Sequence, residues 1–195
     1  AQVRLDRPVA AARGDRLVIR RVSPIVTIGG GWVVDPTPRR HKRKRRERHL
    51  GLLTALRDRG APLVERIAAL LADAEPVALS RADLARRMAE PPEAIKDAFT
   101  ALADDGRALL LDDGTAVDAG VLERYGPRMA QEVATYHDAY PLRIGAPRNQ
   151  LRSSLPGEVP RPLFERVLQR VLDDHALEEV GGKVRRRGFE PSPSE

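Results

Sequence analysis

The chain of 195 residues contains no cysteine. This excludes disulfides and thiolate metal sites, and it favours a reducing compartment. No run of 18 apolar residues occurs, so the sequence predicts no membrane-spanning helix. The segment 1–8 lacks the charged-then-apolar layout of a signal peptide, and it starts without Met, as a fragment or trimmed chain would. We therefore expect a cytoplasmic protein.

Catalytic motifs are missing as well. The sequence has neither the phosphate-binding loop G-x-x-x-x-G-K-[ST] nor the nucleophile elbow G-x-S-x-G. The three consecutive glycines at 29–31 have the wrong spacing for a dinucleotide-binding loop and favour a turn or bulge. The histidines are scattered without the spacing of metal ligands: His41, His49, His137 and His175. We expect no metal, no cofactor and no enzymatic activity in this chain.

Positive charge is concentrated in one short segment. Residues 39–48 hold eight of the 34 Lys and Arg residues and one of the 28 Asp and Glu residues. The rest of the chain carries 26 basic and 27 acidic side chains, so it is nearly neutral although the whole chain has a formal net charge of +6. This segment, called the basic run below, is therefore expected to dominate the attraction of polyanions.

The basic run is the main candidate for a functional site. Lys and Arg side chains neutralise phosphates and release counterions, which gives binding that weakens steeply with salt. The run has no aromatic residue to stack on bases, so we expect contacts to tRNA, the ribosome or mRNA that do not depend on sequence. A solvated linker is the alternative interpretation. The candidate RNA-binding residues are Arg39, Arg40, Lys42, Arg43, Lys44, Arg45, Arg46 and Arg48.

The first 36 residues have the pattern of short β-strands. Val3 and Leu5 alternate with polar residues, residues 16–22 follow a Gly-Asp turn signal, and residues 25–28 and 32–34 predict a further short pair. About four strands are too few to close a barrel. We therefore predict the end of a larger barrel, which stays ordered only if it packs on the following domain or dimerises.

The rest of the chain contains a repeat. Residues 62–74 predict a helix with an apolar stripe, and Ser80 can cap a short second helix. A third helix begins at Pro91-Pro92 and stops at Asp104-Asp105-Gly106, and a β-hairpin follows. A long helix at about 118–139 would open a second unit of the same order.

Matching apolar positions support this repeat. Ile95, Phe99 and Leu102 correspond to Phe164, Leu168 and Val171, each 69 residues later. Three helices followed by a hairpin are typical of a winged helix. The predicted fold is mainly α with small β-hairpins, with tandem winged-helix domains preceded by a β-barrel remnant. The predicted limits are 1–38 for the barrel end, 39–61 for a basic linker or helix, 62–118 and 119–190 for the winged helices, and 191–195 for a tail.

The two units differ in charge. The third helix of the first unit is acidic on balance, which suits a phosphate backbone poorly. The second unit offers basic residues on its second and third helices and on its wing, although acidic residues are interspersed among them. Packing or spacing without RNA contact is the alternative for both units. The candidates for a second RNA contact are Arg148, Arg152, Arg161, Arg166, Lys183, Arg185, Arg186 and Arg187.

The segment 13–41, RGDRLVIRRVSPIVTIGGGWVVDPTPRRH, resembles a known family. It is similar to the last strands of the third, elongation-factor-Tu-like barrel domain in the bacterial selenocysteine-specific translation elongation factor. The resemblance is carried by four features: the turn at 13–16, Ser23-Pro24, the stretch 27–31 and Asp35-Pro36. Winged helices are also what this family carries after its barrel.

The resemblance implies a role in translation. The family binds GTP, delivers selenocysteinyl-tRNA to the ribosome, recodes UGA, and recognises an mRNA hairpin through the last of four winged helices. No motif of the GTPase domain occurs here, so GTP and magnesium are implied only for that domain. The resemblance implies that this chain is an RNA-facing spacer between tRNA delivery and mRNA recognition, with RNA and the remaining domains of the same factor as partners.

Two other functions compete with this interpretation. A transcriptional regulator with tandem winged helices would bind DNA, but it requires a basic recognition helix and usually a dimer. The acidic first unit and the barrel remnant argue against it. An enzyme is the third possibility, and the missing motifs disfavour it.

Overall fold

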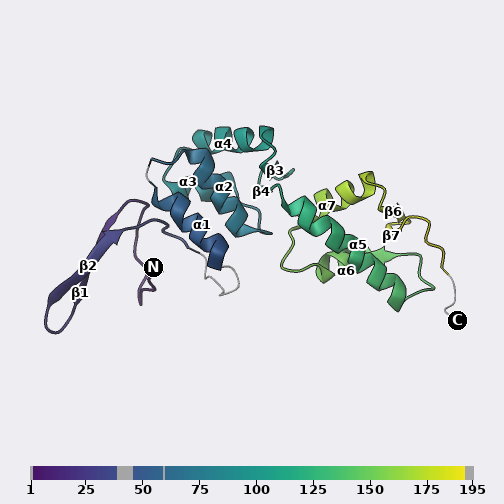
Figure 1. Ribbon diagram of the computed structural model, residues 1–195, viewed down its shortest axis with the longest axis horizontal. Coiled ribbons are helices and arrows are strands. Elements are labelled where there is room, and N and C mark those ends of the chain that lie inside the picture. The colour runs from purple at the N-terminus through teal and green to yellow at the C-terminus, as the bar shows by residue number, and fades with distance from the viewer. Residues whose placement is uncertain (1, 39–45, 59, 192–195) are drawn as a thin grey trace.

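A computed structural model describes residues 2–38, 46–58 and 60–191, without the side chains of 46–48. Figure 1 shows a projecting hairpin followed by two helical units that lie side by side along the long axis. The described part contains seven helices and small antiparallel sheets. The prediction of tandem winged helices after a β segment is therefore confirmed.

The β segment forms one hairpin. Strand β1 (Arg16–Arg21) pairs with β2 (Val26–Trp32), with Arg16 opposite Trp32 and an irregularity after Ile19. A Cβ atom at Gly30 would lie 2.9 Å from the carbonyl oxygen of Leu17, so the close approach of the strands requires glycine there. Two expectations were wrong: residues 2–11 form no strand, and the pair predicted at 25–28 and 32–34 is a single strand.

The hairpin exposes its apolar side chains. Val18 is 66% and Ile28 65% exposed, because each face of a two-stranded ribbon lacks a covering layer within the described residues. The hairpin joins the helical part through Asp35, which accepts hydrogen bonds from Arg87 Nε at 2.9 Å and from Nη2 at 2.6 Å. Arg13 donates to the carbonyl oxygen of Leu56 at 2.7 Å. The expected packing on the next domain is therefore present at the base of the hairpin.

The first unit contains helices α1 (Arg46–Arg57), α2 (Leu63–Ala74), α3 (Arg81–Met88) and α4 (Pro92–Asp104), and strands β3 (Ala108–Leu110) and β4 (Ala116–Asp118). Ser80 caps α3 as predicted, because its Oγ accepts a hydrogen bond from the backbone N–H of Asp83 at 3.1 Å. The core of the unit includes Ile67, Leu71, Leu84, Met88, Ile95, Phe99 and Leu102.

Helix α1 belongs to the same core. Leu52 and Leu56 are buried in it and pack with the apolar face of α2. These two leucines are four residues apart, and this spacing puts side chains on the same face of an amphipathic helix. We propose that the first helical unit begins at α1 and not at residue 62. The other limits, at 38, 118 and 190, stay predictions.

The second unit repeats the order of the first. It contains α5 (Val121–Ala139), β5 (Ala146–Pro147), α6 (Arg148–Ser154), α7 (Arg161–Asp173), β6 (Leu177–Val180) and β7 (Lys183–Arg186). Its core includes Met129, Val133, Leu151, Phe164, Leu168, Val171 and Val184. The matched positions Phe164, Leu168 and Val171 are therefore buried as their counterparts in α4 are.

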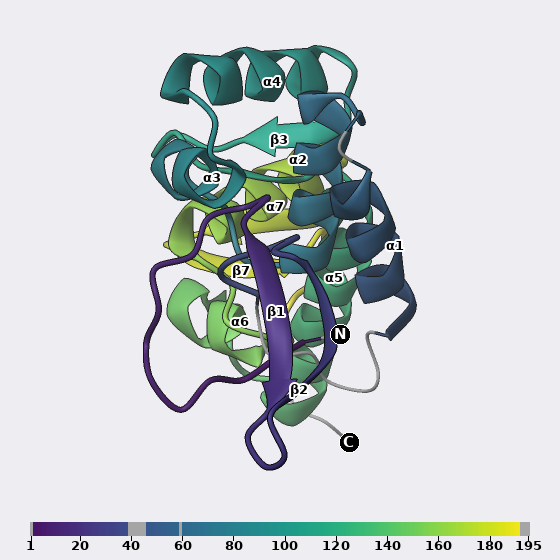
Figure 2. The same cartoon turned by 90° about the vertical axis from the view of Figure 1, so that its left-hand side faces the viewer.

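Each unit also has a short third segment that pairs with its hairpin, before α3 in the first unit and before α6 in the second. In the first unit Leu79 forms a bridge with Ala116 of β4, and in the second unit β5 pairs with β7. The sequence analysis missed both, because one and two residues are too short to show an alternating pattern. Figure 2, viewed along the chain from the hairpin end, shows β1 in front of the helical units.

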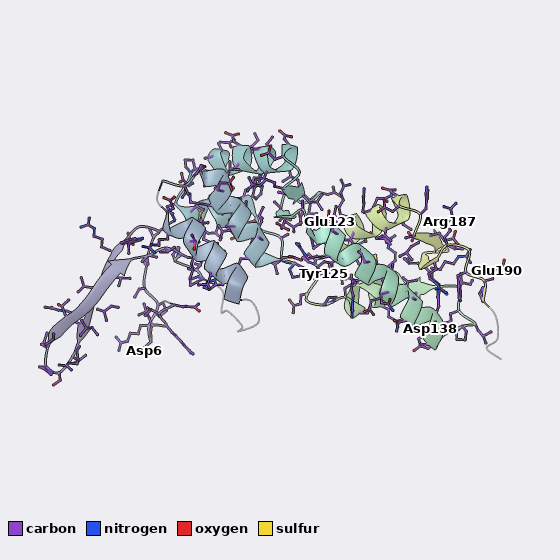
Figure 3. The ribbon with its side chains drawn as sticks, in the orientation of Figure 1. Asp6, Glu123, Tyr125, Asp138, Arg187 and Glu190 are labelled. Atoms are coloured by element: carbon purple, nitrogen blue, oxygen red, sulfur yellow. The ribbon has the colours of Figure 1, made fainter. Side chains whose placement is uncertain are left out.

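The β3–β4 hairpin, which is the wing of the first unit, lies between the two cores. Leu111 and Val117 pack with Val121 and Tyr125 of α5, whereas Ala116 packs in the first core. Figure 3 shows Glu123 and Tyr125 at the end of α5 that is nearer the first unit, and Asp138 at its outer end. The two units thus share a hydrophobic contact at the start of α5.

Candidate nucleic-acid interface

The basic run ends in the first turn of the first helical unit. Residues 39–45 lie outside the described residues, and Arg46 and Arg48 fall in the first turn of α1. The run follows Pro38, at the point where the chain leaves the base of the hairpin. Its eight candidate contacts stay predictions.

The candidates of the second unit lie on three elements. Arg148 begins α6 and pairs with Glu165 of α7 and with Glu179 of β6, the latter at 3.1 Å. Its guanidinium therefore cross-links the unit, and its charge is largely compensated. Arg161 lies 3.8 Å from Glu165 as well, so these two arginines share one carboxylate.

The wing holds a second group of candidates. Arg185 Nε donates to Glu178 of β6 at 2.7 Å and is only 22% exposed. Lys183, Arg186 and Arg187 are exposed and form no ion pair with any described residue. Figure 3 shows Arg187 at the outer end of the second unit, beyond β7. These three cations are free to bind phosphate.

Helices α6 and α7 contribute two further cations of this kind. Arg152 and Arg166 also lack an ion pair among the described residues, and Arg166 is exposed on α7. Arg170, one turn later, pairs with Asp174 at 3.1 Å. The structure thus divides the second set of candidates. The cations without a carboxylate partner in the described part are Arg152, Arg166, Lys183, Arg186 and Arg187.

The first unit is a weaker candidate for binding phosphate. On α4, Lys96 lies 3.6 Å from Glu93, and Asp97, Asp104 and Asp105 are exposed. Near its wing, Arg107 forms two hydrogen bonds with Glu65, each of 2.7 Å, and these hydrogen bonds lower the pKa of Glu65. The exposed face of α4 is therefore acidic, as expected from the sequence, and it would repel phosphate.

One histidine lies behind the wing of the second unit. His137 is 2% exposed, and its ring stacks on Phe189 with 3.6 Å between the ring centroids. Neither ring nitrogen has a hydrogen-bond partner among the described residues. Burial, and then the positive charge of Arg186, lower the pKa of His137. The surroundings of the imidazole therefore favour its neutral form, and its ring packs against Phe189.

Sequence reasoning missed an aromatic and cationic group at the end of α5. The guanidinium of Arg143 lies 4.8 Å from the ring centroid of Tyr140 and donates to the hydroxyl of Tyr136 at 3.2 Å. The sequence signal that could have indicated this group is the spacing of its residues. Tyr136 and Tyr140 are four residues apart, and Arg143 follows three residues after Tyr140. This group is the exposed aromatic surface that the basic run lacks.

The described residues offer neither a metal site nor a membrane span. No group of three or more His, Asp or Glu side chains in the described ranges is placed to hold a metal ion. No helix in the part that the structure describes is long and apolar enough to cross a membrane.

Comparison with protein families supports the resemblance of the hairpin segment. Residues 1–40 match the beta-barrel domain of the selenocysteine-specific elongation factor, and residues 130–185 match the winged helix of elongation factor SelB. A selenocysteine-specific elongation factor from Desulfomicrobium baculatum is 31% identical over 157 residues, which are 78% of this chain. The chain is thus similar, toward both of its ends, to domains of the SelB family of selenocysteine-specific elongation factors.

Relatives in the SelB family are much longer than this chain. The chain spans 24% of the length of the Desulfomicrobium baculatum protein. A crystal structure of a bacterial selenocysteine-specific elongation factor, EF-Sec, superposes with a TM-score of 0.66 over 94% of this chain and 27% of that one, at 17% sequence identity. That likeness shows a shared fold. The match to this family also does not favour the alternative function, a DNA-binding transcriptional regulator.

Proposed function

We propose that this chain is the RNA-facing spacer of a selenocysteine-specific elongation factor. In this role it connects the domains that deliver tRNA to the domains that bind an mRNA hairpin during UGA recoding. It contributes phosphate contacts through the basic run and through the free cations of the second unit. It supplies no catalytic group, and GTP hydrolysis belongs to other domains of the factor, in the cytoplasm.

The observation that carries this proposal is the joint between the two helical units. Arg124 of α5 pairs with Glu75 at 2.6 Å and with Asp118 at 2.7 Å, and both carboxylates belong to the first unit. The wing of the first unit adds apolar contacts to the same joint. A spacer must hold its two ends at a fixed separation, and a joint of this kind restricts rotation between the units.

The distribution of free charge supports contact with RNA. In the sequence the basic run ends in the first turn of α1, the acidic helix α4 follows, and the cations without partners come last, on α6, on α7 and on the wing of the second unit. Phosphate contacts of this kind give affinity without sequence preference. Two separate basic regions on a rigid spacer suit an RNA that is touched at two places.

Binding of the chain to a tRNA, an mRNA hairpin and random duplex DNA across a salt series tests the proposal. One variant carries Gln at all eight basic positions of the run, and a matched control carries Lys at the same positions. We expect the Gln variant to bind RNA more weakly and with a shallower salt dependence, since each lost duplex phosphate contact lowers the slope by about 0.9. The Lys control should behave like the natural chain.

Two results would contradict the proposal. An unchanged salt slope in the Gln variant would remove the basic run from the interface. Binding of duplex DNA far more tightly than either RNA would favour a DNA-binding role instead.

A further inference from the structure

We propose that the cleft between α5 and α6 binds a single unstacked nucleobase of RNA, with Tyr140 and Arg143 as its stacking platform. This inference rests on the proposed RNA-facing function and adds base contacts to the phosphate contacts argued above. It assigns this role to a surface that the basic run and the wing do not include.

The cleft is small and mostly apolar. Its volume is about 160 Å³, and its walls include Glu132, Tyr136, Tyr140, Gln150, Leu151 and Ser154. Specific recognition of RNA relies on unstacked bases that insert against aromatic side chains and are bonded along their edges. A cleft of this size is below the usual range for drug-sized ligands, and it suits one planar ring.

Tyr140 provides the exposed aromatic face. Of the seven aromatic residues in the chain, Trp32 and Tyr140 are the two that are exposed, at 46% and 42%. The ring of Tyr140 lies 4.8 Å from that of Tyr136, at an angle of 45°. The backbone N–H of Tyr140 donates to the carbonyl oxygen of Tyr136 at 2.9 Å, which fixes the end of α5. The platform is therefore held in place before any ligand arrives.

Arg143 completes the platform with a positive charge. Its guanidinium stacks over Tyr140 at 4.8 Å and is hydrogen-bonded to Tyr136, and within the described ranges it has no carboxylate partner. Bases stack on planar guanidinium groups as they do on aromatic rings. A cation held by two tyrosines, without a compensating carboxylate in the described part, is suited to this contact.

The polar groups of the walls favour a base over a phosphate. Glu132 lines the cleft and pairs with Arg128 at 3.0 Å, and its carboxylate is a hydrogen-bond acceptor there, whereas none of the described residues that line the cleft is Lys or Arg. The side-chain amide of Gln150 has no hydrogen-bond partner among the described residues. A carboxylate and an amide together can pair with the amino and ring nitrogen atoms along the edge of a base.

The backbone of the bound RNA would pass from the cleft toward the wing of the second unit. Ala146 lines the cleft and pairs with Val184 of β7, and Pro147 lies opposite Lys183. Figure 3 shows Asp138 at the outer end of α5 and Arg187 beyond β7. Of the free cations of the wing, Lys183 is the one that its strand pairing places next to the cleft. Lys183 can bind a phosphate that flanks the inserted base.

Fluorescence of 2-aminopurine in a short single-stranded RNA tests the inference, because stacking quenches this base. The test variant is Tyr140→Leu, and Tyr140→Phe retains the ring as a conservative control. Trp32→Leu removes the other exposed aromatic residue as a matched control. We expect Tyr140→Leu to lose quenching and about ten-fold in affinity, within the range known for one stacked base. Its salt slope should not change, since no phosphate contact is lost.

The outcomes separate this inference from the proposed function. If RNA binds with a steep salt dependence but Tyr140→Leu quenches like the natural chain, the base site is wrong and the phosphate contacts stand. If quenching depends on Tyr140 but neutralising the basic run changes nothing, the base site stands alone. If Tyr140→Leu instead abolishes self-association of the chain and RNA does not bind, the cleft is a protein interface and the inference falls.

Discussion

Arg124 at the start of α5 donates from Nε to Oε1 of Glu75 at 2.6 Å, and Glu75 is only 6% exposed. The same guanidinium donates from Nη2 to Asp118 at 2.7 Å. Burial alone would lower the pKa of Arg124, but the hydrogen bonds with the two carboxylates raise it. One side chain of the second unit therefore holds the end of α2 and the end of β4, and it fixes how the two units meet.

We predict that Arg124→Gln weakens this joint. The substitution leaves the buried carboxylate of Glu75 without its guanidinium, and a buried acceptor that loses a charged partner costs about 1–3 kcal/mol. Urea unfolding should show a lower midpoint, and small-angle scattering should show a broader distribution of distances between the units. Arg128→Gln is the matched control, since Arg128 is 53% exposed and pairs with Glu132 on the same helix. It should change stability by less than about 0.5 kcal/mol. Equal effects of both substitutions would show that the joint does not depend on Arg124.

We predict that Arg87→Gln releases the β1–β2 hairpin. Arg87 and Asp35 are 11% and 5% exposed, and removing one partner of a buried pair costs about 3 kcal/mol. Limited proteolysis should then cleave near residue 38 faster than in the natural chain. Arg86→Gln is the control, because Arg86 lies next to it on α3 but forms an exposed pair with Asp83. Rapid cleavage of the natural chain at this point would contradict a stable attachment.

We predict that His137 makes the second unit less stable in mild acid. Its folded pKa lies below the ordinary value of 6.5, so the unfolded chain binds the proton more readily. Stability should therefore be full above pH 7, fall as the pH drops through 6.5, and level off below the folded pKa. His137→Phe should remove this dependence and retain the stacking on Phe189. Urea midpoints between pH 5 and pH 8 measure it, with His175→Asn as the exposed control. A natural chain with a flat profile would show that His137 does not titrate as predicted.

The helices of both units could be predicted because their evidence is local. Apolar residues at helical spacing, such as Ile95 and Phe99, are buried where the pattern places them. The repeat strengthened this, since Phe164 and Leu168 occupy equivalent positions. The two-residue strand β5 is different, because only its partner β7, distant in sequence, gives it a regular structure. The Arg124 joint likewise depends on residues 49 positions apart.

The candidate site could be predicted only in part from the sequence, for a related reason. Sequence reveals the number of charges but not their partners. Arg148 and Arg186 look alike in the sequence, yet Arg148 is bound by two carboxylates and Arg186 by none in the described part. Tyr140 was missed because its ring is exposed only where α5 ends, and the helical pattern alone does not show which aromatic residue falls there.

We predict that the free cations of the second unit matter more for RNA binding than its paired cations. Two triple variants with the same change of net charge separate these groups. The first neutralises free cations (Lys183→Gln, Arg186→Gln and Arg187→Gln), and the second neutralises paired ones (Arg161→Gln, Arg170→Gln and Arg185→Gln). Binding of single-stranded RNA across a salt series should give a slope lower by about 2 in the first variant, since each lost phosphate contact removes about 0.7. The second variant should change the slope much less, because each of its arginines already lies within 4 Å of a carboxylate, as Arg185 does with Glu178. Equal slopes in the two variants would mean that RNA responds to the net charge of the unit and not to the wing.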